Sequence, residues 1–274
     1  MNQPRLRVSF ALIGAACLAV SAAPAAAQDV ESQSRDWIVS LGAGARISPE
    51  YPGADSYGFT PMPYFDLRRE GDPLPIEAPD EGSGFGFLGD DSAFDFGPSI
   101  QFQGKRREED VGAPVGDVGF TVEAGAFAQV FVGDNFRLRT EGRRGIGGHK
   151  GWVGDVMADF VLRDDDTYVF TIGPRARWAN DRYHDAYFSV TPTVAAAAGL
   201  PAFDADDGFY SVGAYAGLTY MLGRNWGVYT YAGYDRLVGD AADSPIVRTF
   251  GSRDQFSGGL ALFYSFNAGS LFSR

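Results

Sequence analysis

The chain has 274 residues and carries 23 Lys and Arg against 35 Asp and Glu, a formal net charge of −12. This acidic balance argues against nucleic acid as a partner, because phosphates require clustered Lys and Arg. The single cysteine, Cys17, excludes an intramolecular disulfide and a metal site built from several thiolates.

The first 27 residues have the pattern of a secretory signal peptide. Two arginines precede an apolar stretch from Val8 to Val20, and Ala25–Ala27 supplies small residues before a cleavage point. The apolar stretch is shorter than the ~20 residues that a membrane-spanning helix needs. A lipoprotein with Cys17 as the lipidated residue is the weaker alternative, because apolar residues continue past it. We therefore predict a signal peptide at 1–27, a short periplasmic segment at 28–35 and one domain at 36–274.

From residue 36 onward, apolar and polar residues alternate, which is typical of β-strands. In WVGDVMADFVL (152–162), for example, Asp155 and Asp159 stand opposite the face that carries Trp152 and Phe160. Ten segments show this alternation clearly: 36–47, 59–69, 93–103, 120–132, 135–143, 152–162, 166–178, 209–222, 226–237 and 256–266. Weaker strands are predicted at 85–88 and 186–194, which gives about twelve strands, with a range of 10–12.

Alternation alone does not distinguish a soluble β-sandwich from a transmembrane β-barrel. Aromatic residues near strand ends, such as Trp37 and Trp226, favour the barrel because they suit membrane interfaces. So do apolar faces rich in glycine and alanine, and strands long enough to cross a bilayer at a tilt. Strands of globular proteins average only ~5–6 residues. We predict an all-β, antiparallel, up-and-down transmembrane barrel in the outer membrane, in contact with its lipid.

Two details of this prediction are inconsistent with the usual barrel pattern. The last predicted strand ends at Phe266, but NAGSLFSR follows, so Phe266 and Phe272 are alternative ends of that strand. The short connections VGDN (132–135) and GRN (223–225) fall on opposite sides of a twelve-strand barrel, whereas short turns usually share one side. One connection or one strand of the prediction is therefore misplaced.

Several segments resemble the MipA/OmpV family of outer-membrane proteins, the MltA-interacting proteins. They are WIVSLGAGARISPEYPGADSYGFTPMPYF, GGHKGWVGDV, GPRARWANDRYHDAYFSVTP, AGLPAFDADDGFYSVG and YDRLVGDAADSPIVRTFGSRDQFSGGLALFYSF, and in order they cover essentially all of 36–266. Ser189 departs from the family, which often has glycine there, and the acidic, proline-rich EGDPLPIEAPDEGSG (70–84) is individual to this chain. The resemblance implies an outer-membrane β-barrel. For the founding member it implies a scaffold that links a lytic transglycosylase to a peptidoglycan synthase, and for other relatives a porin-like protein or an adhesin.

Charged residues on the inward face of the predicted barrel form the candidate site. We call it the lumen charge cluster: Arg137, Arg139, Glu141, Asp155, Asp159, Arg175 and Arg177. Further inward charges are expected at Arg46, Asp66, Arg68, Asp95, Glu123 and Asp235. Both signs are interspersed on neighbouring strands, so the cluster is interpreted as an ion-paired lumen. The alternative is a narrow channel in which the four arginines attract anions.

A glycine-rich turn within RRGIGGHKGW matches the Gly-His-x-Gly segment of the family through Gly148, His149 and Gly151. It is not a phosphate-binding loop, because Lys150 is followed by glycine and a strand follows the turn. His149 and His184 are the only histidines, too few for a typical zinc site, and no hydrolase serine motif accompanies His149. We predict no catalytic, cofactor or metal site, and interpret His149 as a polar turn residue at a strand end.

Three functions remain open from the sequence. The first is a non-enzymatic envelope scaffold, for which the resemblance implies a lytic transglycosylase and a peptidoglycan synthase as partners. The second is a small-solute, porin-like channel. The third and least favoured is an outer-membrane hydrolase with His149 as its base.

Overall fold

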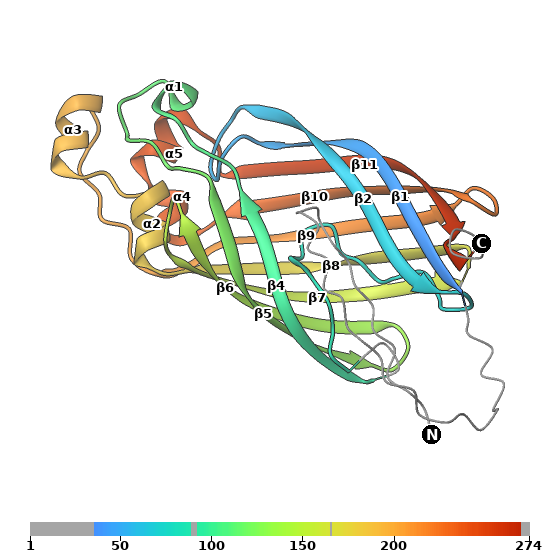
Figure 1. Cartoon of the computed structure of the whole chain (residues 1–274). Helices are drawn as coiled ribbons and strands as arrows, with labels where there is room; N and C mark the ends of the chain where they lie inside the picture. Colours follow the sequence, from blue (N-terminus) through green and yellow to red (C-terminus); the bar gives the residue numbers. More distant parts are fainter. Residues whose placement is uncertain (1–35, 89–91, 165, 270–274) are drawn as a thin grey trace, which may run out of the picture.

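The computed structural model describes residues 36–88, 92–164 and 166–269. In this part of the chain, one antiparallel sheet curls into a barrel (Figure 1), with the strand order β2-β1-β11-β10-β9-β8-β7-β6-β5-β4-β3. The strands are β1 (Trp37–Pro49), β2 (Tyr57–Arg69), β3 (Ser83–Gly84), β4 (Phe94–Gln103), β5 (Thr121–Val132), β6 (Phe136–Gly147), β7 (Trp152–Asp164), β8 (Tyr168–Ala179), β9 (Gly208–Met221), β10 (Trp226–Leu237) and β11 (Asp254–Asn267). The predicted all-β antiparallel fold is confirmed, and the predicted segments 1–27 and 28–35 lie outside the described residues.

Each of the ten clearly alternating segments coincides with one long strand. The predicted strand at 186–194 is wrong: this stretch holds the end of helix α2 (Asp181–Tyr187) and the start of α3 (Pro192–Ala198). Thr191 caps α3 by accepting a hydrogen bond from the Val194 amide at 3.3 Å, and proline at the first helical position suits a helix start. The weak segment at 85–88 runs beside β4, following the two-residue strand β3.

Removing the strand at 186–194 resolves the inconsistency in the short turns. With ten long strands, the connections β5–β6, β7–β8 and β9–β10 all fall at one end of the barrel, the short-turn end. The opposite end, the helical end, carries α2, α3, α1 (Glu108–Val111), α4 (Gly239–Asp243) and α5 (Pro245–Phe250) (Figure 1). The first strand starts, and the last strand ends, at the short-turn end.

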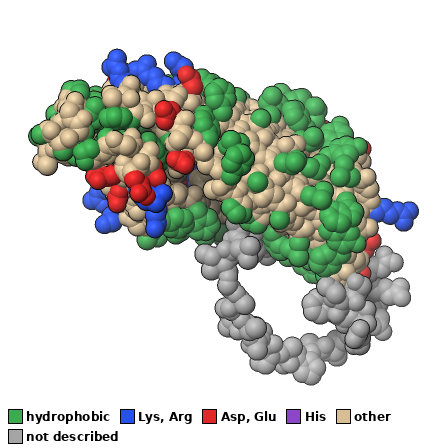
Figure 2. All heavy atoms as spheres, turned by 90° about the horizontal axis from the view of Figure 1, so that it is seen from above, with side chains coloured by type: hydrophobic (Ala, Val, Ile, Leu, Met, Phe, Trp, Pro, Cys, Tyr) green, Lys and Arg blue, Asp and Glu red, His purple; other side chains and the backbone are tan. Residues whose placement is uncertain are grey.

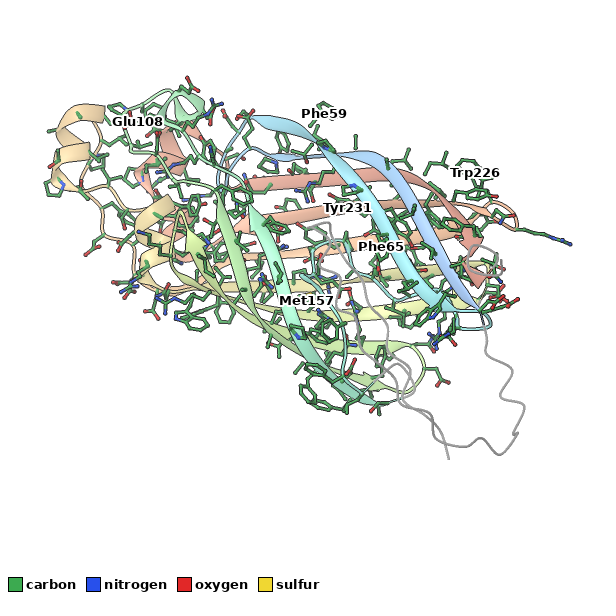
Figure 3. The ribbon with its side chains drawn as sticks, in the orientation of Figure 1. Phe59, Phe65, Glu108, Met157, Trp226 and Tyr231 are labelled. Atoms are coloured by element: carbon green, nitrogen blue, oxygen red, sulfur yellow. The ribbon has the colours of Figure 1, made fainter. Side chains whose placement is uncertain are left out.

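The barrel wall is apolar outside and charged inside. Along β6, Phe136 and Leu138 are exposed by 57% and 49%, whereas the intervening Arg137 is exposed by only 1%. Phe59 of β2 likewise points away from the barrel (Figure 3). Figure 2 shows hydrophobic side chains over the strands, and charged side chains gathered mainly at the helical end. This pattern is the inverse of a soluble sandwich and fits a barrel in lipid.

A compact core lies at the helical end. Tyr183, Tyr187 and Phe188 of the α2 region pack with Ala241 of α4 and Val247 of α5, and all five are buried. These residues sit on the connections β8–β9 and β10–β11, which are much longer than the turns at the other end. None of the helices in the described part of the chain is both long and apolar enough to span a membrane.

The wall is open at one position, between β2 and β4. Among the described residues β2 pairs only with β1, and the outer edge of β4 pairs with β3. The segment between them, residues 70–88, turns back into the lumen (Figure 1). Leu74 of this segment is buried against Val161 of β7 and Val169 of β8, so the segment has an apolar anchor on the inner wall.

Candidate functional site: the lumen charge cluster

The seven residues of the lumen charge cluster lie on three adjacent strands and face the interior. Strand β6 supplies Arg137, Arg139 and Glu141, β7 supplies Asp155 and Asp159, and β8 supplies Arg175 and Arg177. Six of the seven are buried, and the side chain of Arg177 is exposed by 13%. Because alternate residues of a strand share a face, the spacing of two or four along each strand places all seven inside.

The register of the sheet sets opposite charges side by side. Arg137 faces Asp159 across the β6–β7 ladder, and their side chains pair at 2.8 Å. The other carboxylate oxygen of Asp159 accepts from Arg175 Nη2, also at 2.8 Å, so one aspartate joins two arginines from different strands. Asp155 stands opposite Arg177 across the β7–β8 ladder, with 3.6 Å between its Oδ1 and Arg177 Nη1.

A second group of pairs extends the network along β6. Arg139 Nη2 lies 2.7 Å from Glu141 Oε1. Arg143, the next inward residue, contacts Glu141 and Asp155 and lies 3.1 Å from Glu123 of β5 through its Nε. Buried charges are tolerated when they are paired, and each cluster member has at least one partner of opposite charge.

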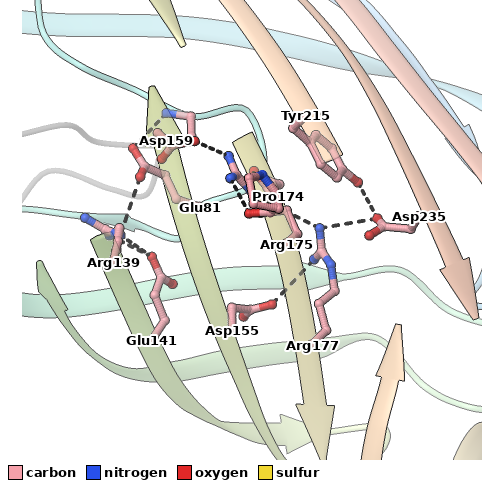
Figure 4. Close-up of polar contacts among 12 residues, drawn as sticks. Glu81, Arg139, Glu141, Asp155, Asp159, Pro174, Arg175, Arg177, Tyr215 and Asp235 are labelled. Carbon is pink, nitrogen blue, oxygen red and sulfur yellow. Dashed lines mark hydrogen bonds and ion pairs between the residues drawn. The ribbon is translucent and has the colours of Figure 1, made fainter. Parts of the chain in front are cut away.

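The segment at 70–84, which we call the inserted segment because it enters the lumen, supplies two further carboxylates to the cluster. Asp80 lies 3.0 Å from both Arg175 Nε and Arg177 Nη2. Glu81 lies 3.0 Å from Arg137 Nη2 and 3.4 Å from Arg139 Nε. Figure 4 shows Glu81 beside Arg139. It also shows Asp159 paired with Arg175, and Asp155 and Asp235 paired with Arg177.

Backbone contacts hold the same segment against the wall. The amide of Gly82 donates to Glu141 at 3.2 Å, and Arg137 Nη1 donates to the Ile76 carbonyl at 3.5 Å. The position of residues 72–82 in the lumen was not predicted from the sequence. The signal that could have done so is the run of acidic residues and prolines beside strands whose inward faces carry arginines.

Within the described residues, two cavities of the lumen border this segment. The larger, of ≈ 980 Å³, reaches from the opening between β2 and β4 to the arginines of β6. The smaller, of ≈ 650 Å³, lies towards the helical end and includes Tyr183, Tyr210 and Asp235 in its lining. Pro79 borders both cavities, and so does Arg46, one of the predicted inward residues.

The turn Gly148, His149 and Gly151 connects β6 to β7 at the helical end. His149 is buried, and Gly151 N–H donates to its Nδ1 at 3.1 Å. Nδ1 therefore accepts, so Nε2 carries the proton and donates to Glu123 Oε1 at 3.1 Å. A Cβ on Gly148 would lie 2.0 Å from the Gly119 carbonyl, and one on Gly151 would lie 2.7 Å from the Tyr183 amide, so both positions require glycine.

The histidine thus extends the lumen network into the helical end. Glu123 accepts from His149 and pairs with Arg143, and the imidazole packs edge-on against Tyr183 at 4.9 Å between ring centroids. Within α2, burial raises the pKa of the Tyr187 hydroxyl and lowers the pKa of the His184 imidazole. Within the described residues, no cluster of three or more His, Cys, Asp and Glu side chains has metal-binding geometry.

The family model "MltA-interacting protein MipA" matches residues 41–266. The chain belongs to the MipA family. The match extends from β1 to β11 and includes the turn at His149, the lumen charge cluster and the inserted segment at 70–84. The architecture and the family together make this chain an outer-membrane β-barrel protein, the coarse function predicted from its sequence.

Solved structures of low similarity include three outer-membrane proteins. The COG4313 outer membrane channel from Pseudomonas putida F1 has 10% identity and a TM-score of 0.38, and the match covers 89% of this chain and 100% of that chain. OmpT of Vibrio cholerae has 8% identity and a TM-score of 0.35, with 88% and 100% covered. OprG from Pseudomonas aeruginosa has 10% identity and a TM-score of 0.24, again with 88% and 100% covered. No protein with a curated description matches this MipA-family chain.

Proposed function

We propose that this MipA-family protein is a non-enzymatic scaffold of the outer membrane, exported through a signal peptide at 1–27. Its proposed partners are a lytic transglycosylase and a peptidoglycan synthase. The family description, "MltA-interacting protein", supports the first partner. The observation that carries the proposal is the segment across the lumen: Asp80 and Glu81 of the inserted segment pair with arginines of β6 and β8. A lumen crossed in this way suits a structural role better than free passage of solutes.

The sidedness of the barrel indicates which surface would bind these enzymes. Short turns of bacterial outer-membrane barrels face the periplasm, where peptidoglycan lies. In this chain the short-turn end exposes Val132 and Asp134 on one turn, and Leu222 and Arg224 on another. An apolar residue beside a charged one on each turn gives a partner both area to bury and a charge to pair with.

A binding experiment with the detergent-purified protein tests the scaffold. Immobilised barrel should capture a purified lytic transglycosylase, and the double change Leu222→Asp with Arg224→Glu should weaken capture at least tenfold. The matched control, Arg107→Glu with Glu109→Lys, lies at the helical end and should leave capture unchanged. Failure to capture either peptidoglycan enzyme contradicts the scaffold proposal.

The alternative function, a small-solute channel, is favoured by one observation: two cavities of the lumen border the inserted segment. Planar-bilayer recordings distinguish the two functions. For a scaffold, the natural chain gives no conductance steps, and replacing residues 73–82 by a Gly-Ser linker produces them. Conductance steps from the natural chain, with anion selectivity reduced by Arg175→Gln, would instead establish the channel.

The hydrolase hypothesis depends on His149, and the environment of this residue disfavours it. Both ring nitrogens already have hydrogen-bond partners, Gly151 and Glu123, and the side chain is buried. A general base must reach the proton that it removes. Lipid or glycan hydrolysis that is lost in His149→Ala, with the fold retained, would restore this hypothesis.

A further inference from the structure

The hydrogen-bond register shows which backbone groups of β2 face the opening between β2 and β4. Glu70 N–H donates to the Asp36 carbonyl, and Glu50 N–H donates to the Ser56 carbonyl, so even-numbered residues of β2 direct their backbone groups towards β1. Odd-numbered residues therefore direct theirs towards the opening. Two of these are Pro61 and Pro63, which have no N–H to donate.

The same reasoning applies to the opposite edge of the opening. Phe131 N–H donates to the Ala93 carbonyl, so odd-numbered residues of β4 face β5 and even-numbered residues face the opening. Pro98 is one of the latter. Beside it, Phe87 N–H donates to the Phe96 carbonyl, so the segment that contains β3 already occupies part of this edge.

These prolines decide what can occupy the opening. A strand of a partner protein, or of a second copy of this chain, would need the N–H groups that positions 61 and 63 lack at the middle of β2. A small molecule needs no such ladder. Pro174 in β8 shows the effect of one proline inside the wall, because the β7–β8 pairing stops at Met157↔Arg175 and resumes at Phe160↔Ile172.

The larger cavity meets the outside of the barrel at this opening. Its lining includes Pro61 and Phe65 of β2 and Ile100 of β4, which belong to the outward faces of their strands. Its floor includes Arg137 and Arg139, which Glu81 approaches at 3.0 and 3.4 Å. The cavity therefore has an apolar mouth at the opening and a floor with paired positive and negative groups, and it also reaches the β5–β6 turn at Gly133 and Asp134.

We propose that this cavity opens laterally into the membrane and binds a zwitterionic single-chain amphiphile. Its acyl chain lies at the mouth, between Phe65 and Ile100, and its headgroup lies at Arg137, Arg139 and Glu81. The headgroup charges complement the mixed charges of the floor, and burial of the chain against the mouth supplies the affinity. The volume of ≈ 980 Å³ falls within the range of about 300–1,000 Å³ typical of small-molecule sites. In hydrocarbon, unpaired strand edges are costly, and the polar cavity behind them reduces this cost.

Photolabelling in phospholipid vesicles tests the site. The probe is a lysophosphatidylcholine with a diazirine in its acyl chain, and the adducts are mapped by mass spectrometry. Outward-facing Leu260 is labelled in any case, because it contacts lipid. The proposal requires labelling of Met62 and Phe127, which face inward and line the larger cavity, but not of Tyr215, which lines the smaller one.

Variants of the chain then separate entry through the opening from other routes. Pro61→Val and Pro63→Val restore two N–H groups on the edge of β2 that faces the opening, and Pro98→Val restores one on the edge of β4 that the β3 segment covers. Together they allow β2 to pair with that segment across the opening, and they should reduce labelling of Met62 and Phe127 at least tenfold. Pro174→Val is the matched control, since it restores an N–H inside a closed part of the wall, and it should leave labelling unchanged.

Three results would overturn the proposal. They are the absence of label at Met62 and Phe127, unchanged labelling in the folded triple variant, and crosslinked dimers joined through β2 or β4, which would identify a second copy as the occupant. If the triple variant does not fold, Met62→Trp serves instead. This larger side chain fills part of the cavity, and unchanged labelling of Phe127 in this variant would also reject the amphiphile site.

Discussion

Asp80 accepts hydrogen bonds from Arg175 at 3.0 Å although 95 positions separate the two residues in the sequence. The same carboxylate lies 3.0 Å from Arg177, so one residue of the inserted segment is tied to two residues of β8. This contact fixes the segment across the lumen. Replacing Asp80 therefore tests how firmly the segment is held.

Removing the charge of Asp80 should loosen the segment without unfolding the barrel. In Asp80→Asn, Arg175 keeps Asp159, and Arg177 keeps Asp155 and Asp235. Because these partners remain, we expect a loss of about 1–3 kcal/mol in the free energy of unfolding, less than for a buried charge left alone. Urea unfolding of the refolded protein measures it. The exposed Asp134→Asn should change the free energy by less than about 0.5 kcal/mol, and an equal loss in both variants would contradict the role of Asp80.

Replacing His149 should destabilise the junction between the lumen and the helical end. His149→Ala leaves Glu123 with Arg143 alone and leaves the Gly151 N–H without its acceptor, for an expected loss of about 1–3 kcal/mol. Hydrogen exchange of the β6–β7 turn and of α2 should accelerate, while exchange at the β9–β10 turn should not. A stability equal to that of the natural chain would show that the two hydrogen bonds contribute nothing.

The helical end should weaken in acid because of His184. Burial lowers the pKa of this imidazole below its ordinary value of about 6.5, and the neighbouring carboxylates of Asp240, Asp181, Asp207 and Asp185 offset this only in part. The unfolded chain therefore takes up a proton near pH 6.5, whereas the folded chain does so only at lower pH. The contribution of neutral His184 to the free energy of unfolding is therefore complete above about pH 6.5, and it declines as the pH falls below that value.

Hydrogen exchange measures this pH dependence. After correction for intrinsic rates, exchange of the α2 amides should be at least severalfold faster, relative to the β6 amides, at pH 5.5 than at pH 7.5. His184→Gln cannot take up the proton and should abolish the difference between the two pH values. A difference that persists in His184→Gln would assign the effect to other groups.

A charge on the outer face should lower the free energy of unfolding strongly in the middle of a strand and only slightly at the end of a strand. Leu262 is 48% exposed and pairs with Ala43 near the centre of β1, so Leu262→Arg should cost about 2–4 kcal/mol. Val132 is 56% exposed at the end of β5, and Val132→Arg should cost about 0–1 kcal/mol. Unfolding from vesicles measures both losses. Equal costs would mean that the apolar belt does not lie in hydrocarbon.

Much of the wall could be predicted from single segments of sequence. Alternation in NFRLRTEGR predicts both the strand β6 and the side to which Arg137, Arg139 and Glu141 point, because side chains alternate between the faces of a strand. The predicted strand at 186–194 failed for a local reason. Thr191 and Pro192 start a helix there, and a short apolar run does not reveal whether it forms a strand or a helix.

By itself, the sequence determined the all-β class, the inward charges and the glycine-rich turn, since each depends on residues close together in the chain. Only the tertiary structure decided that Asp80 and Glu81 enter the lumen, that His149 donates to Glu123, and that the wall stays open between β2 and β4. The prolines at 61, 63 and 98 are visible in the sequence, but the sheet register sets the direction of their nitrogens. Partners of this kind come together only when the strands pair, so no local pattern specifies them.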